Sequence, residues 1–267
     1  MDVYLGLGSN LGNKEVNLIN AISLINLIKL NDGGVLKLIK ASRVYKTSPV
    51  GFSEDECRQG IIPVFLNCVV LYKYENNIDK DNIINKIDNK CDANGCFIES
   101  GFTGCNSGSV ETAEIVVVDD DNDKIMTDYT YCGYENIGID LLLKLKNIEK
   151  ALGRKFDYKD CKKECKDSFI KYRPREIDID ILLLGENIFS HPHPPHPPIL
   201  NIPHKELKNR KFVLQPLLDI NENIVDPLTK RLYKNILCDF IETEEGKSQS
   251  IKPYGVFSDN YLMIDKI

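Results

Sequence analysis

The sequence predicts an α+β fold built on a ferredoxin-like βαββαβ core, an αβα sandwich, with a large insertion before the second core helix. Two observations predict this class. Apolar runs typical of strands occur at residues 3–7, 35–45 and 64–74, and a segment with helical spacing of apolar residues separates the first two. A second amphipathic segment, 139–152, then precedes a strictly alternating apolar–polar segment at 175–181.

The first expected strand runs into the glycine-rich segment GLGSNLG, residues 6–12. Gly6 and Gly8 suggest a dinucleotide-binding fingerprint, but its third glycine comes one place late. A plain strand-to-helix turn with Ser9 or Asn10 near the helix cap is the favoured interpretation. The helix that follows is expected over residues 13–30 because apolar residues recur there at helical spacing.

One domain is expected over residues 1–245. Within it, residues 76–138 are read as an insertion, which begins rich in Asn, Asp and Lys and contains a hairpin around the acidic run DDDNDK. That run lacks the glycine and terminal glutamate of a Ca²⁺ loop, so a solvated turn is expected. Residues 190–198, rich in His and Pro, predict an extended linker rather than a metal site, and residues 246–267 predict a tail or linker with some strand potential.

Composition is that of a soluble globular protein, with 42% hydrophobic and 28% charged residues. The net charge of −6 argues against a nucleic-acid partner, and no apolar run approaches the roughly 20 residues of a membrane span. The nine cysteines form no CxxC pair and no signal-peptide pattern precedes them. They therefore predict reduced thiols and a cytoplasmic location rather than a disulfide framework or structural zinc.

The sharpest chemical signal is a pair of carboxylates in the alternating segment. Asp178 and Asp180 share one face of the expected strand and start roughly 6.6 Å apart at a rise of about 3.3 Å per residue. Such a pair is either a solvated strand face or a site for one or two Mg²⁺ ions. The basic residues just upstream (Lys171, Arg173 and Arg175) favour the second interpretation, because a magnesium–nucleotide complex needs both carboxylates and guanidinium groups.

Two further polar side chains stand out. Asn67 is an amide within the apolar run at 64–74, where a buried amide needs a hydrogen-bond partner, either the backbone or a heterocyclic ligand. His204 differs from the other histidines because it lies just past the His/Pro segment, among four basic residues.

Several motifs, taken together and in this order, closely resemble the 6-hydroxymethyl-7,8-dihydropterin pyrophosphokinase family of folate biosynthesis. They are GLGSNLGN, SRVYKTSPVG, FLN, IEKALGR, RPREIDIDILLLG and PHKELKNRKFVLQPLLDI, within residues 1–75 and 139–241. The resemblance implies transfer of pyrophosphate from ATP to 6-hydroxymethyl-7,8-dihydropterin, giving AMP and the pterin diphosphate. It also implies two Mg²⁺ ions as cofactors and ATP as co-substrate.

The resemblance further implies a role for individual residues. The catalytic group would be Asp178, Asp180, Arg154 and Arg175, of which the two aspartates would hold the metal ions. The nucleotide would contact Glu149, Arg175, Ile181, His204, Lys205 and Arg210. The pterin would contact Thr47, Pro49, Val50, Phe65, Asn67 and Phe212. An aromatic sandwich with a neighbouring amide suits a flat heterocycle of this kind.

The chain departs from the family pattern in places. Tyr172 stands where a tryptophan is usual, Phe65 where a tyrosine is frequent, and residues 154–168 are longer than the usual catalytic loop. Parasitic protozoa and fungi often fuse this enzyme to dihydropteroate synthase, and the Asn/Lys bias suits an apicomplexan-type fusion. A palm-type nucleotidyltransferase and a non-catalytic regulatory domain are the alternatives. The negative charge argues against the first and the intact acidic and basic residues against the second.

Overall fold

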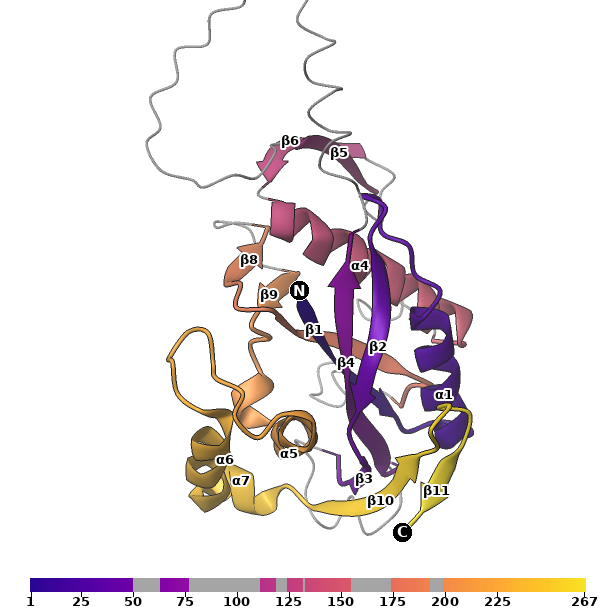
Figure 1. Cartoon of the computed structure of the whole chain (residues 1–267), viewed down its shortest axis with the longest axis vertical. Coiled ribbons are helices and arrows are strands. Elements are labelled where there is room, and N and C mark those ends of the chain that lie inside the picture. Colours follow the sequence, from indigo (N-terminus) through magenta and orange to yellow (C-terminus); the bar gives the residue numbers. More distant parts are fainter. Residues whose placement is uncertain (50–62, 77–110, 119–123, 132, 155–173, 193–198) are drawn as a thin grey trace, which may run out of the picture.

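The structure is a computed structural model that describes residues 1–49, 63–76, 111–118, 124–131, 133–154, 174–192 and 199–267. Its centre is a seven-stranded antiparallel sheet in the order β11-β10-β3-β4-β1-β7, with β2 also paired to β4 (Figure 1). In chain order these strands are β1 (Asp2–Ser9), β2 (Val35–Ala41), β3 (Val44–Thr47), β4 (Phe65–Glu75), β7 (Asp178–Leu184), β10 (Ile251–Phe257) and β11 (Ile264–Lys266). The predicted mixture of helices with a β-sheet is confirmed.

Two helices cover one face of the sheet, α1 (Lys14–Ile25) and α4 (Gly133–Ala151) (Figure 1). Asn13 begins α1, because its side chain accepts a hydrogen bond from the amide of Val16 at 3.2 Å. The core between helices and strands contains Leu18, Ile22, Ile25, Leu141, Leu145 and Ile148. Each such side chain contributes about 1.5–3 kcal/mol when it is fully buried.

The opposite face is only partly covered. Helices α5 (Lys211–Ile220) and α6 (Tyr233–Glu242) pack there against a second apolar cluster that includes Tyr4, Val69 and Leu182. In β7, Leu182 points to the same side as Asp178 and Asp180, because side chains two residues apart share a face. The uncovered part of this face therefore lies beside α5 and carries the two aspartates.

The predicted strand at 35–45 is two strands that both pair with β4. Strand β2 pairs with its second half and β3 with its first. The two strands run in the same direction along β4 and are separated at Ser42, whose backbone amide donates to the Val69 carbonyl while its Oγ accepts from the Val69 amide, both at 2.9 Å. The expected helix at 13–30 also ends earlier, at Ile25.

Residues 246–267 differ most from expectation. They were predicted to be a tail or linker, but β10 pairs with β3 and β11 pairs with β10, so most of this segment extends the main sheet. The short helix α7 (Glu244–Ser248) leads into it. The linker interpretation is wrong because β10 is fixed by pairing with β3, a strand far away in the sequence, and no local pattern encodes that contact.

The predicted insertion contains the expected hairpin, formed by β5 (Glu111–Val118) and β6 (Lys124–Tyr131). Its acidic turn, 119–123, lies outside the described residues. The C-terminal boundary of the insertion is corrected, because residues 133–138 are the first turns of α4. The expected linker at 190–198 is corrected at its start, where β8 (Phe189–His191) pairs with β9 (Leu200–Ile202), and residues 193–198 lie outside the described part. Among the helices that the structure describes, none is both long and apolar enough to cross a membrane.

Candidate active site

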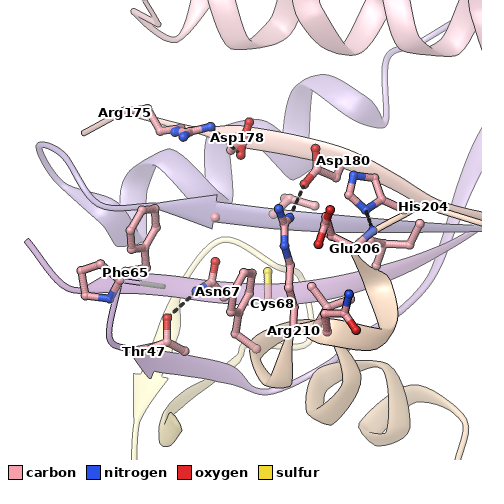
Figure 2. A pocket seen from close by; sticks show the side chains of 18 of the residues that line it. Thr47, Phe65, Asn67, Cys68, Arg175, Asp178, Asp180, His204, Glu206 and Arg210 are labelled. Atoms are coloured by element: carbon pink, nitrogen blue, oxygen red, sulfur yellow. Dashed lines mark hydrogen bonds and ion pairs between the residues drawn. The ribbon is translucent and has the colours of Figure 1, made fainter. Parts of the chain in front are cut away.

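A pocket of about 520 Å³ opens on the partly covered face of the sheet (Figure 2). Strands β1, β4 and β7 supply its floor, and the turn after β3 and the start of α5 supply two walls. Most of the residues singled out in the sequence line it: Thr47, Pro49, Phe65, Asn67, Arg154, Arg175, Asp178, Asp180, His204, Lys205, Arg210 and Phe212. Residues as far apart in the sequence as Gly6 and Arg210 reach one cavity because the fold brings them together.

Strand register arranges the floor. Gly8 of β1 lies opposite Asp178 of β7 on one side and opposite Asn67 of β4 on the other, and Gly6 lies opposite Asp180. A methyl group at Gly8 would come within 2.5 Å of Asn67 Oδ1. The glycines are therefore part of a strand that must leave space between the acids and the amide, rather than a phosphate loop or a helix cap.

We call the part of the pocket around Asp178 and Asp180 the carboxylate end. Arg154 Nη1 lies 2.5 Å from Asp178 Oδ1, and Arg175 Nη1 lies 2.8 Å from Asp178 Oδ2. Burial alone would raise the pKa of the Asp178 carboxyl, but the charges of Arg175 and Arg154 outweigh it and hold this pKa below its ordinary value. Asp178 is therefore a compensated anion.

Asp180 has a different environment. Its described ion pair, with Arg210 Nη1, is long at 3.6 Å, and Figure 2 shows Arg210 reaching up to it from the start of α5. Burial raises the pKa of the Asp180 carboxyl, and the nearby charge of Asp178 raises it further. A hard cation between the two carboxylates would relieve this repulsion, so the donor set fits Mg²⁺, which takes one or two carboxylates together with phosphate oxygens and water.

The described residues contain no group of three or more His, Cys, Asp or Glu side chains that could hold a metal ion. Cysteines 91, 96, 105, 132, 161 and 165, considered for structural zinc, lie outside the described part of the chain.

His204 stands beside Asp180 at the same end (Figure 2). Its backbone amide donates to the Leu182 carbonyl at 2.9 Å, and its Nδ1 accepts from the Glu206 amide at 3.2 Å. Burial lowers the pKa of His204 below its ordinary value, although the charge of Asp180 opposes this. A neutral ring whose Nδ1 accepts carries its proton on Nε2, which can donate to an oxygen in the pocket.

We call the other part, around Asn67, the amide end. Asn67 is buried, and its Nδ2 donates to Thr47 Oγ1 at 2.7 Å (Figure 2). The rings of Phe65 and Phe212 and the side chain of Pro49 also line this pocket. A flat heterocycle finds here aromatic surface together with a fixed amide. Val50, expected at the same edge, lies outside the described residues.

The structure does not place two expected nucleotide contacts on the pocket wall. Ile181 is 2% exposed and belongs to the core under α1 and α4, because its parity is opposite to that of the aspartates. Glu149 is fully buried in α4. Its Oε1 accepts from the amide of Ile179 at 2.7 Å, and its Oε2 lies 2.7 Å from Arg154 Nη1. Burial raises the pKa of the Glu149 carboxyl. Glu149 thus supports Arg154 from beneath the pocket.

Gly6 and Gly8, which the sequence suggested only as part of a turn, also line the pocket. Further lining residues were not predicted: Leu7, Ser48, Cys68, Lys146, Leu182, Glu206, Asn209, Val213 and Glu245. Two of them carried a usable signal. Lys146 precedes Glu149 by three residues and so shares its helix face, where its Nζ lies 2.9 Å from Glu149 Oε1. Leu182 continues the parity of Asp178 and Asp180.

Comparison with known proteins agrees with this geometry. The family described as 7,8-dihydro-6-hydroxymethylpterin-pyrophosphokinase (HPPK) matches residues 4–94 and 130–222. A protein of Aquifex aeolicus named 2-amino-4-hydroxy-6-hydroxymethyldihydropteridine pyrophosphokinase is 36% identical over 95 residues, which are 36% of this chain and 48% of that protein. The folic acid synthesis protein fol1 of Pneumocystis carinii is 26% identical over 227 residues, which are 85% of this chain and 18% of that protein.

The chain therefore spans less than half the length of these two relatives in its matches. A solved HPPK-DHPS structure in complex with substrates superposes with a TM-score of 0.48 at 13% identity, covering 100% of this chain and 48% of that one.

Proposed function

Because the chain belongs to the 7,8-dihydro-6-hydroxymethylpterin-pyrophosphokinase family, we propose that it transfers the pyrophosphoryl group of ATP to the hydroxymethyl oxygen of 6-hydroxymethyl-7,8-dihydropterin. The products would be AMP and the pterin diphosphate, an intermediate of folate biosynthesis. One observation carries the proposal: a single pocket joins a carboxylate end, rich in cations and acids, to an amide end with aromatic walls. A substrate pair made of a phosphate chain and a flat heterocycle has the same division.

At the carboxylate end, Asp178 and Asp180 would hold the two Mg²⁺ ions, which neutralise charge on the phosphate oxygens. The guanidinium groups of Arg154 and Arg175, which pair with Asp178, face the space where those oxygens would lie. Arg210 approaches it from the opposite wall. Guanidinium donors suit phosphate because they form paired, charge-assisted hydrogen bonds.

Two more residues complete the phosphate contacts. His204 would donate from Nε2 to a phosphate oxygen, and Lys205 would add a positive charge beside it. Phosphoryl and pyrophosphoryl transfer need alignment and charge neutralisation more than a strong base, so no further acid–base group is required of the pocket.

At the amide end, Asn67 would bind the polar edge of the pterin, held in place by its hydrogen bond to Thr47. Phe65 and Phe212 would stack on the ring, and Pro49 and Val50 would border it. The shared strand register of β1, β4 and β7 then sets the distance between the bound pterin and the carboxylates. The protein would thereby hold the hydroxymethyl oxygen in line with the β-phosphorus, which is the main requirement for attack.

We extend the proposal to the core fold and to the domain plan. The order β1, α1, β2 with β3, β4, α4, β7 and the antiparallel arrangement of those strands support a ferredoxin-like core, with an insertion between β4 and α4. We propose a pyrophosphokinase domain that comprises residues 1–245 together with β10 and β11. The names of plant relatives, which are folate synthesis bifunctional proteins, support a fusion to a second enzyme, for which dihydropteroate synthase is the predicted partner.

Separation of the nucleotide products by chromatography tests the activity. The chain is incubated with ATP, Mg²⁺ and 6-hydroxymethyl-7,8-dihydropterin, and we expect AMP to form only when the pterin is present. ADP as the main pterin-dependent product would indicate a kinase that transfers a single phosphoryl group to the pterin. Incorporation of the nucleotide into a nucleic-acid primer, with release of pyrophosphate, would indicate a nucleotidyltransferase, and no ATP consumption at all would indicate a binding domain.

A further inference from the structure

Helix α5 begins without a cap from its own sequence. Arg210 occupies the N-cap position, and its side chain makes no capping hydrogen bond. Its guanidinium group lies in the pocket instead, near Asp180. The first amides of a helix have no partner inside the helix and are usually satisfied by Ser, Thr, Asp or Asn at the N-cap. With an arginine in that position, α5 needs an acceptor from elsewhere.

Gln249 supplies that acceptor from 38 residues further along the chain. Its Oε1 accepts from the Lys211 amide at 2.8 Å, and its Nε2 donates to the Asn209 carbonyl at 2.9 Å. The two bonds hold the backbone on both sides of Arg210. Gln249 is only 5% exposed, and both ends of its amide have these partners. A buried amide used in this way fixes backbone position more strictly than apolar packing does.

The residues after Gln249 reach the opposite wall of the pocket. The amide of Ser250 donates to Ser48 Oγ at 3.1 Å, and the amide of Ser48 donates to the Ser250 carbonyl at 3.2 Å. Ile251 then pairs with Thr47, the residue that accepts from the Asn67 side chain. Residues 249–251 therefore join the start of α5 to the turn after β3.

We propose, on the basis of the function proposed above, that Gln249 is a positioning residue for the transfer. It aims Arg210 at the phosphate chain and holds Phe212 at the pterin by fixing the backbone between Asn209 and Lys211. The C-terminal segment 249–251 is then part of the active-site frame, although Gln249 itself does not line the pocket.

Three variants test this role. Gln249→Met keeps the approximate volume and removes both hydrogen bonds. Gln249→Glu keeps an acceptor for the Lys211 amide, favoured at a helix N-terminus, but cannot donate to Asn209 when ionised. Ser248→Ala is the matched control, because among the described residues the Ser248 hydroxyl donates to the Glu245 carbonyl, within α7.

Steady-state rates are measured at a temperature where thermal melting shows every variant fully folded. We expect kcat/KM for the pterin to fall roughly tenfold in Gln249→Met, within the range that a misplaced binding group produces. Gln249→Glu should recover part of this loss, and Ser248→Ala should match the wild type. A purely structural role would lower the melting temperature and leave kcat/KM of the folded protein unchanged, which would overturn the proposal. A Glu variant no better than the Met variant would also overturn it.

Hydrogen exchange separates this proposal from the proposed function. In the ligand-free protein, the amides of Lys211 and Ser48 should exchange faster in Gln249→Met than in wild type or Ser248→Ala. That result does not depend on any turnover, so a wild type that fails to form AMP would count against the function alone. Unchanged exchange at Lys211 would overturn the positioning role even if the enzyme is active.

Discussion

Different interactions hold the side chains at the two ends of the pocket. At the carboxylate end, charged groups compensate one another only in part. Asp178 pairs with two arginines, whereas Asp180 has one distant arginine and is repelled by the charge of Asp178. At the amide end, the strand register and one neutral hydrogen bond hold Asn67 directly beside Gly8. The first end should respond to pH, cations and charge removal, and the second to changes of a single methyl group.

The largest effect is expected from removing a carboxylate charge. Asp178→Asn and Asp180→Asn keep side-chain shape but lose a preferred Mg²⁺ ligand, so turnover should fall on the order of 10²-fold or more. Rates at saturating Mg²⁺ and both substrates measure this, with Asp239→Asn on the exposed face of α6 as the matched control. Activity of both pocket variants within a few-fold of wild type would show that neither carboxylate is needed as a Mg²⁺ ligand.

Adding a single methyl group at the amide end should weaken pterin binding and leave nucleotide binding nearly unchanged. Gly8→Ala places a Cβ against Asn67 Oδ1, and such overpacking costs about 1–3 kcal/mol, which would raise the Kd for a pterin by about 5- to 150-fold. The alanine variant of Asn67 should act in the same direction. Calorimetric titration with 6-hydroxymethylpterin and with an ATP analogue checks this.

Gly133→Ala is the control for that experiment, because a Cβ at Gly133 meets nothing within 4 Å. Affinity for the ATP analogue should be nearly unchanged in all three variants. If both ligands lost affinity equally, Asn67 would be a structural amide and the division of the pocket would be wrong.

The two aspartates should have opposite effects on stability in metal-free protein. The folded-state pKa of Asp178 is lowered, so its charge stabilises the fold above its unfolded pKa, and this contribution disappears as pH falls. The folded-state pKa of Asp180 is raised, so its contribution is present at low pH and is lost as pH rises through that pKa.

Thermal unfolding in EDTA between about pH 4 and pH 8 tests whether the two aspartates contribute to stability with opposite signs. At the upper end, Asp178→Asn should melt below wild type and Asp180→Asn at or above it, with shifts of about 2–4 °C for each kcal/mol. Both differences should shrink toward the lower end. Equal destabilisation by both variants at neutral pH would contradict the assignment.

The smallest effect is expected from the insertion. Described lining residues of the pocket lie outside it, so replacing residues 79–130 by a short linker should leave kcat and both KM values within a few-fold. The start of α4 must be kept, since Glu135 and Gly138 are buried there. A folded deletion variant that binds both substrates and does not turn over would assign the insertion a catalytic role.

Local sequence patterns were sufficient to predict the parts of the site that lie on a single strand or helix. The alternation in β7 predicts that Asp178 and Asp180 share a face, and helical spacing predicts α1 and most of α4. The closeness of Gly8 to Asn67 depends on the register between strands almost 60 residues apart, which no local pattern encodes. The same applies to Gln249, because a cap supplied from 38 residues away leaves no signature near α5.

The direction of each side chain explains why two nucleotide contacts implied by the family resemblance do not line the pocket. Ile181 faces the core because it is one residue out of phase with the aspartates, and Glu149 points beneath the sheet surface to hold Lys146 and Arg154. Sequence matching carries a residue's position to this chain but does not show whether its side chain reaches the cavity.

The central claim is that one pocket aligns a pterin hydroxyl with the β-phosphorus of a bound nucleotide. Separate reactions with ATP radiolabelled at the β- or at the γ-phosphorus, followed by isolation of the pterin product, test it most directly. The account predicts that both labels appear in the pterin product in equal amounts and that the released AMP carries neither. Transfer of the γ-label alone, with the β-label retained in ADP, would contradict it.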